Sequence, residues 1–157
     1  MGLIRNSFTI VLFILIFVSC NSDDTPQNRE LIFGWFADSS CSGDCAQIYK
    51  IGNEKVFKDI DFNYPKGNYF TGNFKEMSTV SYDELLVLLD HLPDELLDEP
   101  NGYLDCTDCS DEQGGFYLEY KTDKTHKSWR FRNAQYPTYL ESFRSLLLDK
   151  IAFLNSN

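Results

Sequence analysis

Three short stretches rich in apolar residues follow one another in the first half of the chain, separated by polar and turn residues. Residues 31–37 (LIFGWFA) and 46–51 (AQIYKI) are rich in aromatic and β-branched residues, and the Ser, Cys, Gly and Asp cluster between them is typical of a turn. Gly52 and Asn53 then separate the second stretch from residues 54–62, which alternate only imperfectly. These signals predict three strands arranged as a meander.

A helical pattern follows these strands. Ser81 and Glu84 have the spacing of a capping box, and leucines then recur at helical spacing until Pro93. A second short helical piece is predicted for residues 94–97, ahead of Pro100.

The last part of the chain returns to strand alternation and ends in a helical stripe. Residues 114–121 (GGFYLEYK) alternate as a strand does, and residues 126–132 (HKSWRFR) are its predicted hairpin partner. Pro137 suits the first turn of a final helix, whose apolar residues recur on one stripe from Leu140 to Leu154. The order β-β-β-α-β-β-α predicts an α+β fold, in which an antiparallel sheet carries its helices on one face. Residues 31–157 have the length of a single domain.

The chain begins with a short basic and apolar segment. Arg5 precedes residues 8–18, which are almost wholly apolar but shorter than the roughly 20 residues that span a membrane. The following Phe17-Val18-Ser19-Cys20 resembles the lipobox of bacterial lipoproteins, in which a small residue precedes the lipid-bearing cysteine. This resemblance implies a signal peptide at residues 1–19 and a lipid on Cys20. The alternative is an uncleaved membrane anchor with an incidental cysteine.

Residues 20–30 are predicted to be a lipidated cysteine followed by a flexible tether, because residues 21–30 contain no apolar side chain. Ser22-Asp23-Asp24 is similar to the acidic signal that sends lipoproteins of Bacteroidota to the cell surface. The expected location is therefore the outer membrane, lipid-anchored and facing the cell surface. A periplasm-facing position is the alternative, since Asp23 and Asp24 are also ordinary tether residues.

The charge of the chain limits its partners. Its formal net charge is −10 at pH 7, and a polyphosphate backbone binds proteins through Lys and Arg. Nucleic acid is therefore not an expected partner. The expected partners are the membrane, through the lipid, and an envelope protein or glycan.

Four cysteines remain besides Cys20, and their even number in an exported domain favours disulfides. Cys41 and Cys45 lie in CSGDC, and Cys106 and Cys109 lie in CTDC. Pairing between the two motifs closes a longer loop and stabilises more, about 4 against about 2 kcal/mol. Each motif is nevertheless turn-like and brings its own cysteines together early, which favours Cys41 with Cys45 and Cys106 with Cys109.

Two other chemistries remain open for these segments. Two cysteine pairs also have the form of a four-thiolate zinc site, and C-x-x-C is a redox motif, although the acidic residues around CTDC disfavour a thiolate. The carboxylates of Asp105, Asp108, Asp111 and Glu112 offer oxygen ligands for calcium, without the order of an EF-hand loop. No cofactor is otherwise expected apart from the covalent lipid on Cys20.

The stretch from residue 62 to residue 74 mixes aromatic residues with amides and turn residues. If exposed, these aromatics suit the binding of a sugar or a peptide; otherwise they cap a core. The candidate ligand-binding residues are Phe62, Tyr64, Tyr69, Phe70 and Phe74. His91 and His126 are expected to be structural or solvated, and common catalytic motifs are missing from the sequence.

The segment Cys41-Ser42-Gly43-Asp44-Cys45, with Tyr49 downstream, resembles a small extracytoplasmic domain of unknown function found in lipoproteins of Bacteroidota. That resemblance transfers no catalytic residue. The expected function is a membrane-anchored, non-enzymatic binding or envelope-assembly module. The alternative is a small zinc- or calcium-binding protein or a thiol-redox protein.

Overall fold

The computed structural model describes residues 28–110 and 113–157. Within them, seven strands form one sheet in the order β4-β3-β2-β1-β6-β7-β5. The strands are β1 (Glu30–Asp38), β2 (Ala46–Gly52), β3 (Lys55–Asp59), β4 (Phe74–Glu76), β5 (Gly102–Tyr103), β6 (Gln113–Lys121) and β7 (His126–Phe131). The helices are α1 (Asp83–Asp90), α2 (Asp94–Asp98) and α3 (Glu141–Asn155), with a 3₁₀ turn, η2 (Thr138–Leu140), before α3.

Strand β1 is the centre of the sheet and pairs antiparallel with β2 and β6. Phe33 lies opposite Tyr49 on one side and Leu118 on the other. All strand pairs in the described residues are antiparallel except β5 with β7. The predicted α+β fold with a mostly antiparallel sheet is confirmed.

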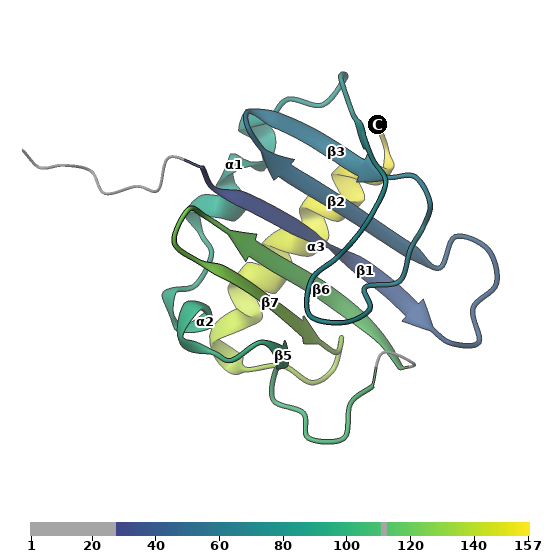
Figure 1. Ribbon diagram of the computed structural model, residues 1–157, viewed down its shortest axis with the longest axis vertical. Helices are drawn as coiled ribbons and strands as arrows, with labels where there is room; N and C mark the ends of the chain where they lie inside the picture. The colour runs from purple at the N-terminus through teal and green to yellow at the C-terminus, as the bar shows by residue number, and fades with distance from the viewer. Residues whose placement is uncertain (1–27, 111–112) are drawn as a thin grey trace, which may run out of the picture.

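The helices cover one face of the sheet, as predicted (Figure 1). The leucine stripe of α1 and the apolar stripe of α3 supply this layer, with Leu85, Leu88, Leu147 and Ile151 buried. They pack on sheet residues that include the fully buried Trp129. These side chains form the larger of two hydrophobic clusters.

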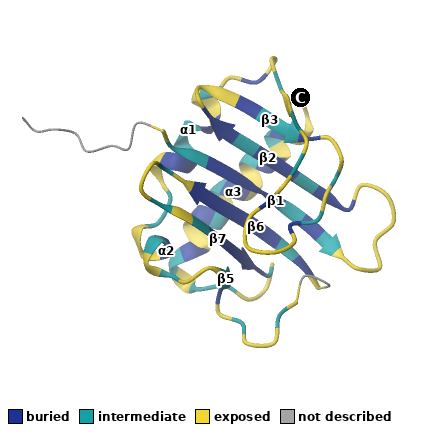
Figure 2. Cartoon of the chain, in the orientation of Figure 1, coloured by how far each residue is buried: buried dark blue, intermediate teal, exposed yellow. Residues whose placement is uncertain are grey.

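The opposite face of the sheet is covered by a loop instead of a helix. Residues 60–73, here called the cover loop, pass in front of β1 and β6 in Figure 1. Strand β1 is apolar on both faces, so the second face also needs cover, and Figure 2 shows the buried positions along its length. Phe70 from the cover loop packs there in a smaller cluster with Ile32, Phe36, Ala46, Ile48 and Tyr117.

Several boundaries differ from those predicted. The third strand ends at Asp59 rather than at residue 62, because the chain turns away and Phe62 adopts a positive φ of 53°. The capping box at Ser81 does not form: α1 begins at Asp83 after Tyr82, without a side-chain cap. Pro137 precedes η2 rather than the first turn of α3. Strands β4 and β5 were not predicted, since they are only three and two residues long.

The two disulfides join neighbours within each motif, Cys41 to Cys45 and Cys106 to Cys109, which confirms the predicted pairing. The sulfur atoms are therefore bonded to each other and are not available as four thiolates for zinc. In the described part of the chain, none of the helices has the length and apolar character needed to cross a membrane. Residues 1–27, with the predicted signal peptide, Cys20 and most of the tether, lie outside that part.

Candidate functional site

The cover loop is closed at its base by one buried carboxylate. Asp59, the last residue of β3, is 1% exposed. One of its oxygens accepts a hydrogen bond from the Asn63 N–H at 2.9 Å, and the other accepts one from the Asn73 N–H at 2.7 Å. Because a single side chain binds both limbs of the loop, it fixes where the loop leaves the sheet and where it returns.

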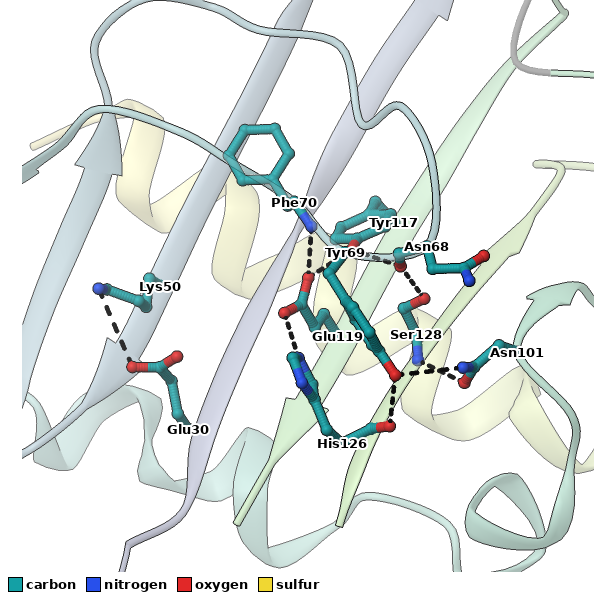
Figure 3. Close-up of polar contacts among 10 residues, drawn as sticks. All are labelled: Glu30, Lys50, Asn68, Tyr69, Phe70, Asn101, Tyr117, Glu119, His126 and Ser128. Carbon is teal, nitrogen blue, oxygen red and sulfur yellow. Dashed lines mark hydrogen bonds and ion pairs between the residues drawn. The ribbon is translucent and has the colours of Figure 1, made fainter. Parts of the chain in front are cut away.

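The tip of the loop is held by a second buried carboxylate, that of Glu119 on β6 (Figure 3). Glu119 is 4% exposed and accepts a hydrogen bond from the Phe70 N–H at 2.7 Å. The same oxygen accepts the hydroxyl hydrogen of Tyr117. Burial, together with this negative neighbour, raises the pKa of Tyr117, so its hydroxyl remains a donor.

A buried cation holds the segment between these two points. Arg130 on β7 is 5% exposed, and its guanidinium donates to the carbonyl of Pro65 at 2.9 Å and to that of Gly67. The guanidinium also lies over the Tyr117 ring, 5.2 Å from its centroid. Ser128 Oγ donates to the carbonyl of Asn68. The cover loop is thus bound along its length to side chains of the sheet.

His126 completes the network at the edge of the loop. Its Nε2 lies 2.7 Å from Oε1 of Glu119. Its ring stacks on Tyr69 with centroids 3.6 Å apart, and the Tyr69 hydroxyl donates to the His126 carbonyl at 3.0 Å. The prediction that His126 is structural or solvated agrees with this partly exposed position.

A carboxylate beside a histidine also occurs in general-base catalysis, so the surroundings of this pair matter. The three hydroxyls of the network all donate to groups other than the histidine ring: Tyr69 to the His126 carbonyl, Tyr117 to Glu119, and Ser128 to the Asn68 carbonyl. The remaining side-chain contact of Glu119 is with the loop backbone, at the Phe70 N–H. The arrangement is suited to holding the loop.

Residues of the cover loop line a cavity. The cavity, of about 490 Å³, is lined by Phe62, Asn63, Tyr64, Lys66 and Thr71. Tyr64 is fixed there, because its hydroxyl donates to the Asp38 carbonyl at 3.1 Å and its ring meets Phe36 edge-on. This cavity, here called the loop hollow, combines two aromatic rings, an amide, a hydroxyl and an ammonium group.

The five aromatic residues predicted to bind a ligand are divided by the structure. Phe62 and Tyr64 line the loop hollow. Tyr69 is 39% exposed but is engaged with His126. Phe70 is 8% exposed and belongs to the smaller hydrophobic cluster, so its predicted ligand contact does not fit its buried position. Phe74 is half-buried and packs against the same cluster and the Phe70 ring. It therefore caps a core, which was the alternative to ligand binding.

The predicted calcium ligands do not form a cluster in the described residues. Asp105 and Asp108 are exposed, and Asp111 and Glu112 lie outside the described residues. Across residues 28–110 and 113–157, no group of three His, Cys, Asp or Glu side chains has an arrangement that could hold a metal ion.

Sequence reasoning missed the three buried charges, Asp59, Glu119 and Arg130. A usable signal was present for Glu119: it lies between the apolar Leu118 and Tyr120, so strand alternation directs it to the face opposite the helices. The predicted architecture placed the helices on one face and assigned no cover to the other, so no role for Glu119 was predicted. Its partners in the cover loop lie about 50 residues away and have no local signal.

Comparison of the chain with known protein families, with curated proteins and with solved structures finds no match to any of them.

Proposed function

We propose that this protein is a lipid-anchored, non-enzymatic binding module whose ligand site is the loop hollow. The observation that carries the proposal is the attachment of the cover loop by three buried charged side chains, those of Asp59, Glu119 and Arg130. Surface loops are usually the mobile parts of a domain. A loop that is fixed at its base, middle and tip is instead prepared for recognition.

The three buried charges hold the cover loop at an energetic cost. Burying a charged group is costly unless it is paired and hydrogen-bonded, and apolar side chains of similar volume often stabilise a fold as well or better. Covering one face of a sheet therefore does not require three buried charges. A loop held in one conformation does lower the entropy lost when a ligand binds.

The composition of the loop hollow supports a sugar or peptide ligand. Its volume of about 490 Å³ lies within the range of ligand pockets, roughly 300–1,000 Å³. The rings of Phe62 and Tyr64 offer apolar faces, and Asn63 and Thr71 offer adaptable hydrogen bonds. An envelope glycan or an envelope protein is the proposed partner.

The anchor is the second part of the proposal. The lipobox resemblance at residues 17–20 supports cleavage after Ser19 and lipid on Cys20, with the residues ahead of β1, which begins at Glu30, as the tether. An extended tether of nine residues reaches at most about 30 Å, so the domain would remain close to its membrane. We propose the outer membrane, with the domain on the cell surface; a periplasm-facing domain is the alternative.

The test is a binding measurement on the full chain purified in detergent. A panel of envelope and extracellular oligosaccharides and peptides is passed over the immobilised protein, and every ligand found is measured again on Phe62→Ala and Tyr64→Ala. Phe57→Ala is the matched control, because Phe57 is a half-buried aromatic residue outside the loop hollow. Loss of binding in the two hollow variants, but not in the control, supports the proposal. Unchanged binding in both hollow variants, or no binding across the panel, contradicts it.

A further inference from the structure

We infer that the ligand of the loop hollow is a carboxylated sugar, bound through its anionic group by Lys66 and through its ring by Phe62 and Tyr64; this inference rests on the proposed function. Among the residues that the structure describes, Lys66 is the one charged side chain that lines the hollow. The chain as a whole carries a net charge of −10. A single cation in the hollow of an anionic protein selects for an anionic group.

The position of Lys66 is set by the buried network. Arg130 donates to the carbonyls of Pro65 and Gly67, which are the residues directly before and after Lys66. Pro65 itself is buried, whereas Lys66 is exposed. The hydrogen bonds from Arg130 therefore fix the backbone on both sides of Lys66, while the Lys66 side chain remains exposed. A fixed backbone lowers the entropy lost when the ammonium group pairs with a ligand.

The backbone of Phe62 provides an independent observation. Its φ of 53° lies in the left-handed region, which is a genuine outlier for a bulky residue. The hydrogen bond from the next residue, Asn63, to Asp59 holds the chain in this turn. Backbone strain of this kind concentrates at ligand sites. The strained turn places the Phe62 ring in the wall of the hollow.

A sugar fits this lining better than an acidic peptide does. A pyranose ring has an apolar face that stacks on aromatic rings, and its hydroxyl groups match the amide of Asn63 and the hydroxyl of Thr71. A peptide bound in an extended form takes much of its affinity from main-chain bonds to a sheet edge. The described residues that line the hollow all belong to the cover loop, and none belongs to a strand.

The experiment compares acidic oligosaccharides with neutral counterparts of the same skeleton, on the full chain in detergent. The probes are oligomers of galacturonate and glucuronate and a sialylated oligosaccharide, each paired with its methyl ester, together with a Glu-rich peptide. Each dissociation constant is measured at low and at high salt. Lys66→Gln and Lys66→Glu are the test variants. Lys75→Glu is the matched control, because Lys75 is an exposed lysine on β4 outside the hollow.

We expect at least one acidic sugar to bind about tenfold or more tightly than its ester, since hydrogen bonds between ionised groups are stronger than those to neutral groups. Lys66→Gln should remove that difference, Lys66→Glu should abolish binding of the acid, and Lys75→Glu should leave it unchanged. Binding of the acid should also weaken at high salt.

The inference is overturned if no acid binds more tightly than its ester, if Lys66→Gln leaves the difference intact, or if only the Glu-rich peptide binds. Its failure is distinguishable from failure of the proposed function. If neutral sugars bind as tightly as the acids and their binding is lost in Phe62→Ala, the loop hollow is still the ligand site. In that case only the inference of a carboxylated ligand fails. Binding that is unchanged in Phe62→Ala and Tyr64→Ala would show that the loop hollow is not the ligand site, which contradicts the proposed function.

Discussion

The carboxylate of Glu119 accepts a hydrogen bond from the backbone N–H of Phe70 at 2.7 Å, which joins β6 to a loop 49 residues earlier in the chain. This contact places a charged side chain inside the cover of the sheet rather than in solvent. Together with Asp59 and Arg130, it makes the cover loop part of the fold. The stability of the domain and the shape of the loop hollow should therefore depend on the same side chains.

Replacing Glu119 with alanine should destabilise the domain by about 2–4 kcal/mol, because the Phe70 N–H and the Tyr117 hydroxyl lose their buried acceptor. Glu119→Gln should cost less, since its amide oxygen can accept both hydrogen bonds while its NH₂ group faces the His126 ring. Equilibrium denaturation measures both effects. Equal stability of the wild type and the alanine variant would show that the network does not support the fold. Glu76→Gln, in the exposed pair with Lys55, is the control and should be close to neutral.

Gly72 should not tolerate a side chain, because a Cβ there would lie 2.3 Å from the Phe70 ring and 2.8 Å from Oδ1 of Asp59. Gly72→Ala is expected to destabilise the domain by about 1–3 kcal/mol and to loosen the base of the loop. Hydrogen exchange should then quicken at the Asn63 and Asn73 amides, which donate to Asp59. The neighbouring exposed Thr71→Ala serves as the control. Unaltered exchange at both amides in Gly72→Ala would contradict the assigned role of Asp59.

The sheet and its helical layer could be predicted because their signals are local. The aromatic and β-branched run at residues 31–37 indicates a strand, and the alternation in residues 114–121 and the leucine spacing after Glu84 each indicate one buried face. The disulfide pairing was also local, since each turn holds its own two cysteines. These features needed no knowledge of distant parts of the chain.

The site could be predicted only in part, for the opposite reason. The aromatic stretch at residues 62–74 indicated a segment that either binds a ligand or caps a core, but its composition does not say which rings are buried. Phe70 is buried and Tyr64 lines the hollow because Glu119 and Arg130, from strands late in the chain, fix the loop over the sheet. A contact between residues so far apart leaves no periodic signal in a single sequence.

Reduction of the disulfides should weaken the domain without unfolding it. Each bond closes a short loop, with sequence separations of 4 and 3, and the chain-entropy model gives about 2 kcal/mol for loops of that size. The denaturation midpoint should fall in reductant, and Cys41→Ser with Cys45→Ser should reproduce part of the fall. Intact mass of the oxidised protein should show no alkylatable thiol among these four cysteines. Complete unfolding in reductant alone would show that the core depends on these bonds.

Alkaline pH should destabilise the domain through buried tyrosines. Burial raises the pKa of Tyr49 to about 12, and its hydroxyl donates to Asn155; burial also raises the pKa of Tyr117 and of Tyr139. Between about pH 10, where unfolded tyrosine ionises, and about pH 12, the unfolded state releases protons that the folded state retains, so the free energy of unfolding falls. Denaturation curves across this range measure the fall. Tyr49→Phe should make it shallower, and an unchanged slope would contradict the assigned contribution of Tyr49.

The proposed lipid anchor predicts a change in lipid content and cleavage from a single atom. Cys20→Ser replaces the sulfur that would carry the lipid with an oxygen that the lipobox pathway does not modify, while leaving residues 28–157 intact. The wild-type protein should fractionate with membranes and enter the detergent phase, because two or more acyl chains hold a protein stably at a bilayer. The variant should carry no lipid and should keep residues 1–19, because cleavage follows addition of the lipid. Ser19→Ala is the matched control, since alanine keeps a small residue before the cysteine. Its intact mass should show loss of residues 1–19 and an added lipid. If the intact mass of the wild-type protein shows residues 1–19 retained and no added lipid, residues 8–18 act as an uncleaved anchor and the lipoprotein proposal is wrong.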